Sequence, residues 1–242
     1  MILAAGLGTR LRPMTNNLPK ALIEINNIPL LEIAIKKLIK YGFDEIIINV
    51  HHFPAKIRAF LHEKKNFNIR IELSDETDNL LDTGGGLKKA SWFFNSDEAF
   101  LVYNVDILSD IDLKQLINYH SANNSIAMLS VKKRNSSRYF LFDENNFLKG
   151  WKNVKSNETK IVRYTGIELK ELAFNGIQIL DPKIFALMPD KDTFSLVDLY
   201  LSAANKNNIF GFEDDSSFFL DVGKKENLIE AEKLIPGLGF DE

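Results

Sequence analysis

The sequence predicts an α/β protein built around a mixed, mainly parallel sheet. Three observations support this class. Short apolar runs alternate with helix-spaced amphipathic segments through the first half of the chain. Glycine, proline and asparagine lie between these runs, where turns are needed. Polar or charged residues follow the apolar runs, as they do in parallel sheets that bind ligands beyond the carboxyl ends of their strands.

The first half is predicted to alternate strands with helices. Apolar runs predict strands over 1–5, 45–50, 69–73 and 100–103, a short extended piece over 21–25 and a turn at 26–27. Helical spacing predicts helices from Pro29 to Gly42, from Pro54 to about Lys64 and over 86–94. Strands that are joined through helices lie parallel, with both faces of their sheet covered.

The second half is predicted to be a small mixed insertion that is richer in strands. Strands are expected over 125–131, 139–142, 161–164, 173–180, 209–212 and 218–221, and helices over 181–187, 194–205 and from Lys224 onward. Asparagine-containing pairs at 145–146, 152–153 and 156–157 predict loops. We expect one domain over 1–242, with halves of about 1–122 and 123–242.

Composition excludes several classes of function. The 242 residues are 45% apolar, which is enough for a substantial core. A net charge of −3 argues against a general nucleic-acid binder, and the absence of cysteine excludes disulfide and thiol chemistry. No apolar run is long enough for a membrane span and no secretory leader is recognisable, so we expect a cytoplasmic protein, monomeric or a small homo-oligomer. Whether residues precede Met1 stays open.

The residues after the first strand predict a loop that binds a nucleoside triphosphate. Gly6 and Gly8 allow close backbone approach, and successive loop N–H groups can face phosphate oxygens. Arg10, Arg12 and Lys20 add positive charge. The chain has no G-x-x-x-x-G-K-[ST] run, and a leucine replaces the third glycine of a dinucleotide loop. Both better-known phosphate loops are therefore excluded.

Two aspartates are candidate ligands for Mg²⁺, which prefers oxygen ligands. Asp106 follows the predicted strand 100–103, and Asp221 ends the apolar run that begins at Phe218. Each has another interpretation from spacing alone. Asp106 could cap a turn, and Asp221 could be the N-cap of the last helix.

Five segments together resemble the sugar-nucleotide pyrophosphorylases, enzymes that join a sugar 1-phosphate to a nucleoside triphosphate. They are 3–11 with Pro13, Thr15 and Pro19-Lys20, then 83–87, 104–106, 174–177 and 221–223. They occur in the family's order along nearly the whole chain. The Thr-Gly-Gly-Gly segment looks most like small bacterial uridylyltransferases acting on N-acetylmuramate 1-phosphate, with mannose-1-phosphate guanylyltransferases close to them. The resemblance implies the nucleotide-diphospho-sugar transferase fold, a Rossmann-like doubly wound sheet.

The resemblance also implies roles for individual residues. Arg10, Lys20 and Asp106 would be catalytic, with Asp106 and Asp221 holding Mg²⁺. Nucleotide and sugar contacts would come from Ala4, Ala5, Gly6, Gly8, Thr9, Thr83, Gly84, Gly85, Asn175 and Gly176. The glycines at 84–86 are expected before a helix, where they would expose backbone N–H groups.

Two departures from the family pattern leave the sugar side open. The family's Glu-Lys-Pro run is missing, and Lys149 or Lys152 could make a phosphate contact in its place. Val105 stands where a glycine usually precedes the metal-binding aspartate.

Adjacent histidines on a strand point to opposite faces, so His51 and His52 are expected to be structural or to lie at the rim of the site.

The expected reaction is transfer of a nucleotidyl group to a sugar 1-phosphate, with release of pyrophosphate and formation of a nucleotide sugar for cell-envelope or glycan synthesis. UTP is favoured, with GTP next; the partners are these small molecules, with no nucleic acid and no membrane. One alternative is a cytidylyltransferase for a small phosphorylated alcohol such as phosphocholine. Another is a non-catalytic nucleotide-sugar-binding regulatory protein. The Thr-Gly-Gly-Gly segment argues against the first alternative, and the joint presence of the four charged site residues argues against the second.

Overall fold

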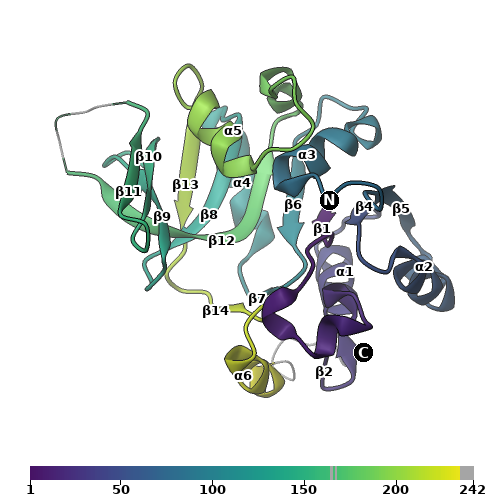
Figure 1. The fold of residues 1–242 in the computed structure, drawn as a ribbon. Coiled ribbons are helices and arrows are strands. Elements are labelled where there is room, and N and C mark those ends of the chain that lie inside the picture. Colours follow the sequence, from purple (N-terminus) through teal and green to yellow (C-terminus); the bar gives the residue numbers. More distant parts are fainter. Residues whose placement is uncertain (164–165, 167, 235–242) are drawn as a thin grey trace. The chain divides into compact units, whose positions relative to one another are not determined.

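The computed structural model describes residues 1–163, 166 and 168–234, and the chain forms two compact units (Figure 1). The first unit contains 1–81, 103–110 and 218–234, and the second contains 82–102 and the described part of 111–217. Each unit is therefore assembled from segments that lie far apart in the sequence.

The first unit contains a parallel sheet. Its strands are β1 (Ile2–Leu3), β4 (Glu45–Val50), β5 (Arg70–Asp75) and the end of β6 (Phe100–Asn104), in the order β6-β1-β4-β5. Every neighbouring pair in this order is parallel. β4 is buried along its Ile-Ile-Ile centre, as an inner parallel strand must be. The predicted α/β class is confirmed, and strands lie at the four expected places, although the first is limited to Ile2–Leu3 and the expected extended piece 21–25 begins inside a 3-10 helix at Lys20–Leu22.

Helices and two short antiparallel pairs complete the first unit. They are α1 (Leu30–Lys40), α2 (Pro54–Glu63) and α6 (Glu226–Leu234), with β2 (Glu24–Ile25) paired to β3 (Ile28–Pro29) and β7 (Ile107–Ser109) paired to β14 (Phe219–Asp221). Asn26 and Asn27 form the predicted turn, with φ of 50° and 62°. The pair β7–β14 was not expected from the sequence, although it positions part of the site.

The second unit contains the mixed sheet predicted for the insertion. Its strands are β8 (Ala127–Lys132), β9 (Arg138–Phe142), β10 (Leu148–Asn153), β11 (Glu158–Ile161), β12 (Lys170–Leu180) and β13 (Ile209–Glu213). The order is β11-β10-β9-β12-β6, with β8 paired to β12 and β13 paired to β8 in parallel. The predicted loop at 152–153 is wrong, because these residues pair with β9 and β11 inside β10.

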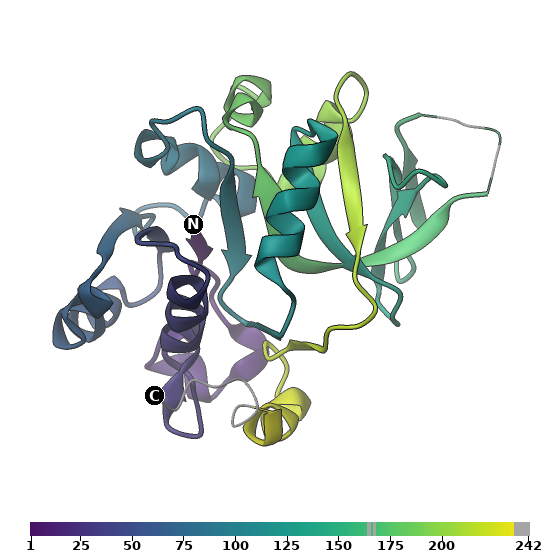
Figure 2. The ribbon, with the colours of Figure 1, turned by 180° about the vertical axis from the view of Figure 1, so that it is seen from behind.

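The helices of the second unit are α3 (Asp82–Lys89), α4 (Leu113–Asn123) and α5 (Leu196–Ala203). Figures 1 and 2 show α5 and α4 on opposite faces of the β8, β12 and β13 strands. Ser195 caps α5 by accepting a hydrogen bond from the Asp198 N–H at 3.1 Å, as expected of a helix-start serine. The predicted helix over 181–187 is a 3-10 helix. The predicted strand over 161–164 is wrong for its described residues, because β11 ends at Ile161, and Tyr164 lies outside the described residues.

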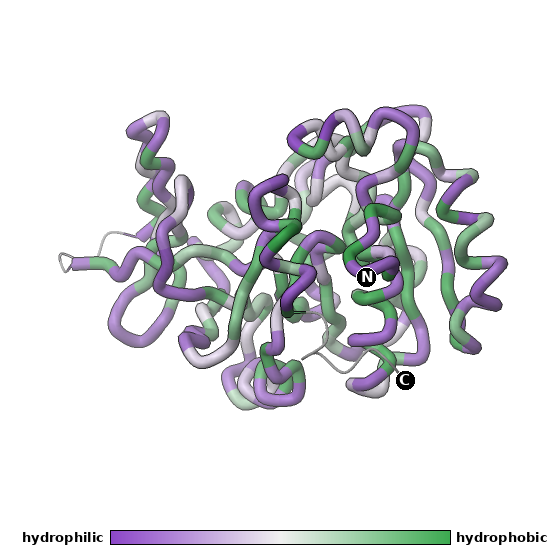
Figure 3. Tube along the Cα trace, turned by 90° about the horizontal axis from the view of Figure 1, so that it is seen from below, coloured by the Kyte–Doolittle hydropathy of each residue, from purple (hydrophilic) through white to green (hydrophobic). Residues whose placement is uncertain are grey.

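Hydrophobic and hydrophilic residues alternate along the helical coils (Figure 3), which is typical of amphipathic helices that cover a sheet. Within the described part of the chain, no helix has both the length and the apolar character of a membrane span.

Lys37 is a charged group inside the first unit. It lies on α1 with only 5% of its surface exposed, and its Nζ donates a hydrogen bond to the Ser109 carbonyl of β7. The ammonium also lies 5.7 Å from the centre of the Tyr103 ring. Burial lowers the pKa of Lys37 to about 8, and the negative charge of Asp110 opposes part of this shift.

Because Lys37 is buried, we expect the free energy of unfolding to depend on pH, and we expect Lys37→Met to remove this dependence. Between about pH 8 and the ordinary lysine pKa of 10.5, the unfolded chain keeps a proton that the folded protein has lost. The free energy of unfolding contributed by Lys37 therefore rises with pH in this window. The stability of the native protein relative to Lys37→Met should increase by about 2 kcal/mol between pH 8 and pH 10, measured by urea denaturation. Parallel stability curves for the two proteins would contradict the buried location.

Candidate functional site

The loop after β1 is shaped by Gly8. Gly8 has a φ of 62°, and its carbonyl accepts hydrogen bonds from the Leu11 N–H and the Thr15 hydroxyl, both at 2.9 Å. A Cβ at this position would lie 2.8 Å from Thr15 Cγ2 and 3.0 Å from Lys20 Cβ. Glycine is therefore needed both for the left-handed backbone and for the space.

The same loop offers free backbone donors. Among the described residues, the N–H groups of Ala5, Gly6 and Leu7 donate to no protein acceptor. Ala5 is buried, whereas Gly6 and Leu7 are exposed, and Thr9 begins the 3-10 turn that follows. Consecutive unused N–H groups in a turn form a concave site for an anion.

The pairing of β7 with β14 brings the two candidate metal ligands together. Asp221 lies opposite Ile107 in the register, and the Val222 N–H donates to the Asp106 carbonyl at 3.0 Å. A Cβ on Gly223 would lie 2.8 Å from Asp106 Oδ2 and 2.8 Å from Asp221 Oδ1. Both carboxylates therefore converge on the backbone of Gly223.

Two cations join these carboxylates. Lys20 Nζ forms an ion pair with Asp106, and both side chains are largely shielded from water. Arg10 Nη1 lies 3.6 Å from Asp221 Oδ2, but the Arg10 side chain is 57% exposed. An exposed pair contributes little stability, so the Arg10 guanidinium can turn to another anion at low cost.

The structure thus unites Arg10, Lys20, Asp106 and Asp221, as the sequence predicted. It also adds Gly223, which the site prediction missed although the family motif ends on it. The alternative of Asp221 as a helix N-cap does not hold, since its Oδ1 accepts from the Gly223 N–H at 2.9 Å and α6 begins only at Glu226.

The carboxylate pair is the candidate metal centre. In the described part of the chain, no group of three or more His, Asp or Glu side chains is arranged to hold a metal ion. A divalent cation at Asp106 and Asp221 would thus complete its shell with phosphate and water oxygens. This is the usual arrangement for Mg²⁺ in sites that bind phosphates.

The glycines at 84–86 lie inside α3, which corrects the expected loop before a helix. The N–H groups of Gly84 and Gly85 donate to the Phe194 carbonyl at 2.9 and 3.1 Å, and Thr83 Oγ1 accepts from the Leu196 N–H at 2.9 Å. The expectation that Gly84 and Gly85 expose unused donors is wrong, because the Phe194 carbonyl already occupies them. A nucleotide contact by Thr83, Gly84 and Gly85 stays a prediction.

Asn175 and Gly176 lie at an irregularity of β12, where its register with β8 shifts. Gly176 has a φ of 72°. The Asn175 side chain is buried, and its amide donates to Ser130 Oγ at 3.1 Å. Arg134, which the sequence prediction missed, donates to the Phe174 carbonyl at 2.7 Å. A sugar contact at 175–176 stays a prediction, and both residues are buried in β12.

The two lysines left open for a phosphate contact differ in accessibility. Lys149 is buried and forms an ion pair with Asp143 at 3.0 Å. Lys152 lies on the more exposed end of β10 and pairs with Glu171 at 2.6 Å. Lys149 is therefore a buried, paired cation, and Lys152 is the more accessible of the two lysines.

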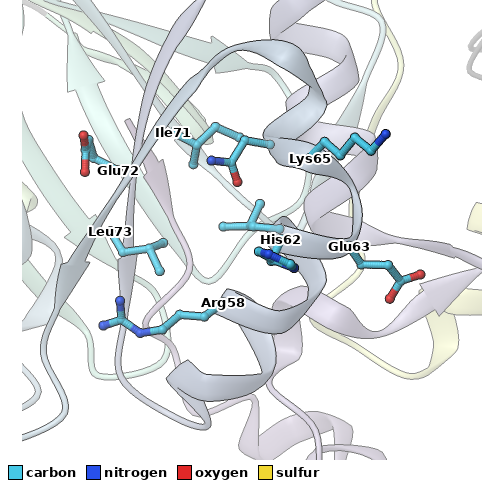
Figure 4. A pocket seen from close by; sticks show the side chains of 9 residues that line it. Arg58, His62, Glu63, Lys65, Ile71, Glu72 and Leu73 are labelled. Carbon is cyan, nitrogen blue, oxygen red and sulfur yellow. The ribbon is translucent and has the colours of Figure 1, made fainter.

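A groove of about 990 Å³ lies elsewhere in the first unit, between α2 and β5 (Figure 4). None of the predicted site residues lines it. Its charges are balanced locally, since Arg58 pairs with Asp75 at 2.8 Å and Arg70 lies 3.6 Å from Glu72. We therefore assign the groove no part in the chemistry.

Comparison with known families and sequences gives consistent matches. A sequence model described as "Nucleotidyl transferase" matches residues 1–236. A mannose-1-phosphate guanyltransferase of Hypocrea jecorina is 30% identical over 95% of this chain, but the chain spans only 62% of that enzyme. An N-acetylmuramate alpha-1-phosphate uridylyltransferase of Caulobacter vibrioides is 30% identical over 96% of this chain and 94% of its own length.

Solved structures share the fold. HddC from Yersinia pseudotuberculosis, crystallised in complex with GMP-PN, has a TM-score of 0.77 and 23% identity over 97% of both chains. The inositol-1-phosphate CTP transferase from T. maritima has a TM-score of 0.79 and 16% identity, covering 99% of this chain and 95% of its own. At these identities the likeness concerns the fold.

The packing of α3 predicts that Gly84→Ala destabilises the protein. A Cβ at Gly84 would lie 2.4 Å from the Phe194 ring and 2.8 Å from its carbonyl oxygen. Alanine normally favours a helix over glycine, but this overlap should lower the free energy of unfolding by about 1–3 kcal/mol. Gly6→Ala is the matched control, with no atom within 4 Å of its Cβ and an expected change within about 0.5 kcal/mol. The free energy of unfolding is measured by urea denaturation. A Gly84→Ala protein that is as stable as the native one would contradict the close packing of Gly84 against Phe194.

Proposed function

The chain belongs to the nucleotidyl transferase family, and from this membership we propose that it transfers a nucleotidyl group from a nucleoside triphosphate to a sugar 1-phosphate, with release of pyrophosphate. One observation carries the proposal. Asp106, Asp221 and Arg10 converge at Gly223 and Lys20 pairs with Asp106, in the same unit as a loop with unused N–H donors. Such a site neutralises and orients phosphates, which is the main requirement of phosphoryl-type transfer.

The proposed reaction needs no general base. An oxygen of the sugar 1-phosphate attacks the α-phosphorus in line and forms the new O–P bond. The bond from the α-phosphorus to the bridging oxygen breaks, and pyrophosphate leaves with the electron pair. Because the second pKa of a phosphate monoester is about 6, the attacking group is already mostly dianionic near neutral pH.

The residues of the site divide this work between them. Lys20 would neutralise the charge that accumulates as the two phosphates approach each other. Arg10, exposed and weakly paired, would follow the charge that develops on the leaving pyrophosphate. The unused N–H groups of Ala5, Gly6 and Leu7, together with Thr9, would orient the triphosphate.

Asp106 and Asp221 would hold a divalent cation, for which we propose Mg²⁺. The pair fits, because two carboxylates face one position where even a Cβ would be in close contact with both. When bound, such an ion supplies charge stabilisation between the reacting phosphates.

UTP is proposed ahead of GTP, and N-acetylmuramate 1-phosphate ahead of mannose 1-phosphate. The uridylyltransferase relative matches this chain along 94% of its own length, whereas the guanyltransferase relative extends well beyond the match. A CTP reaction with a phosphorylated alcohol is the second candidate. Its support is the fold likeness to the inositol-1-phosphate CTP transferase.

A pyrophosphate-release screen tests the proposal. UTP, GTP, CTP and ATP are each combined with a panel of sugar 1-phosphates and with phosphocholine and inositol 1-phosphate, in the presence of Mg²⁺. We expect the fastest release with UTP and N-acetylmuramate 1-phosphate. Release only with CTP and a phosphorylated alcohol would establish the second candidate. Nucleotide binding without release for any acceptor would support a regulatory protein instead.

Asp106→Asn should lower kcat by about 10²–10³, because it removes one of the two charged ligands proposed to hold the divalent cation. Asp221→Asn should act in the same direction, and both variants should need more Mg²⁺ for half-maximal rate. Asp44→Asn is the matched control, since Asp44 is an exposed aspartate before β4. Full activity of Asp106→Asn at low Mg²⁺ would exclude its proposed metal role.

A further inference from the structure

A buried amide on β4 holds the beginning of the nucleotide loop. The Ala4 N–H donates to Asn49 Oδ1 at 2.7 Å, across 45 residues of sequence. Asn49 is only 3% exposed. β1 ends at Leu3, which lies opposite Asn49 in the register, so a side chain rather than a backbone carbonyl receives the first amide beyond the strand. The direction in which the chain enters the loop therefore depends on Asn49.

Asn49 is itself fixed by a buried carboxylate. Its Nδ2 donates to Glu76 Oε1 at 2.8 Å, and Glu76 is fully buried. The Glu76 backbone is held on both sides, because its N–H donates to the Val50 carbonyl at 2.7 Å and its carbonyl accepts from His51 Nδ1 at 2.6 Å. The carboxylate thus has little freedom to move away from Asn49.

The second carboxylate oxygen accepts from the residue just before α3. Glu76 Oε2 accepts from the Leu81 N–H at 3.3 Å, and Leu81 is the residue immediately before α3. The contacts of Asn49 and Glu76 therefore connect the first residue of the phosphate loop to the residue that leads into the predicted nucleotide-binding segment 83–85. Ala4, Asn49, Glu76 and Leu81 are all buried.

We propose that Asn49 and Glu76 are positioning residues for the nucleoside triphosphate, acting through the Ala4 and Leu81 backbones. This role rests on the proposed function, because it assumes that the loop after β1 binds the triphosphate. Each partner is oriented by the hydrogen bonds of the other. Buried polar networks of this kind hold one geometry when every member is satisfied and lose it when one is not.

The pair can be reversed in polarity without losing its three hydrogen bonds. In Asn49→Asp alone, two carboxylates face each other; in Glu76→Gln alone, one amide donor faces another donor. The double variant Asn49→Asp with Glu76→Gln restores the pattern. The introduced carboxylate accepts from the Ala4 N–H and from the introduced amide, whose oxygen accepts from the Leu81 N–H.

Steady-state kinetics of these variants test the proposal. We expect each single variant to raise the KM for the triphosphate about tenfold. The KM for the sugar 1-phosphate should change less than about twofold, because the predicted sugar contacts lie at 175–176. The double variant should return the triphosphate KM to within about threefold of the native value. Glu76→Gln nearly conserves side-chain volume, so it gives a folded single variant if Asn49→Asp does not fold.

Ser74→Ala is the matched control. Ser74 lies opposite Asn49 on β5, is equally buried, and its hydroxyl has no hydrogen-bond partner among the described residues. It should leave both KM values unchanged. Single variants that melt at a lower temperature but keep the native triphosphate KM would overturn the positioning role. Equal increases in both KM values would also overturn it, because they indicate general loosening. A native protein that forms no nucleotide sugar would overturn the proposed function and this role with it.

Discussion

The charge cluster of Arg10, Lys20, Asp106 and Asp221 is the constraint on which the candidate site of the first unit depends. Two neighbouring carboxylates repel each other, so each of them needs a cation beside it. Lys20 meets this need for Asp106 in a shielded pair, and Arg10 meets it for Asp221 in an exposed one. The two cations therefore differ in freedom, because Lys20 is held in a shielded pair and the Arg10 side chain is exposed.

Three separate segments must meet for this arrangement to form. The loop after β1 contributes Arg10 and leads to Lys20, the end of β6 leads to Asp106, and β14 ends in Asp221. The short β7–β14 pair holds the last two segments in register. A side chain on Gly223 would displace both carboxylates from this position.

Much of the candidate site could be predicted from the sequence, because loop chemistry is local. The positive φ of Gly8 and the charges that follow it are properties of one continuous stretch. The helical conformation of the glycines at 84–86 could not be predicted from local sequence. Three glycines disfavour a helix, but the carbonyl and ring of Phe194 pack so closely against α3 that only glycine fits at 84. Asn175 was likewise assigned correctly to a strand, but its burial against Ser130 depends on a pairing that sequence spacing does not reveal.

The sequence by itself determined the α/β class and the parallel strands of the first half, and it predicted the loop after β1 and the four charged residues as a site, because periodicity and motif order reflect local backbone chemistry. Only the tertiary structure decided which groups meet. It paired β7 with β14, directed both carboxylates to Gly223, and joined Ala4 to Glu76 through Asn49. These contacts join residues tens to more than a hundred positions apart. They are set by packing and by the need to satisfy buried polar groups, and neither leaves a pattern in a short stretch of sequence.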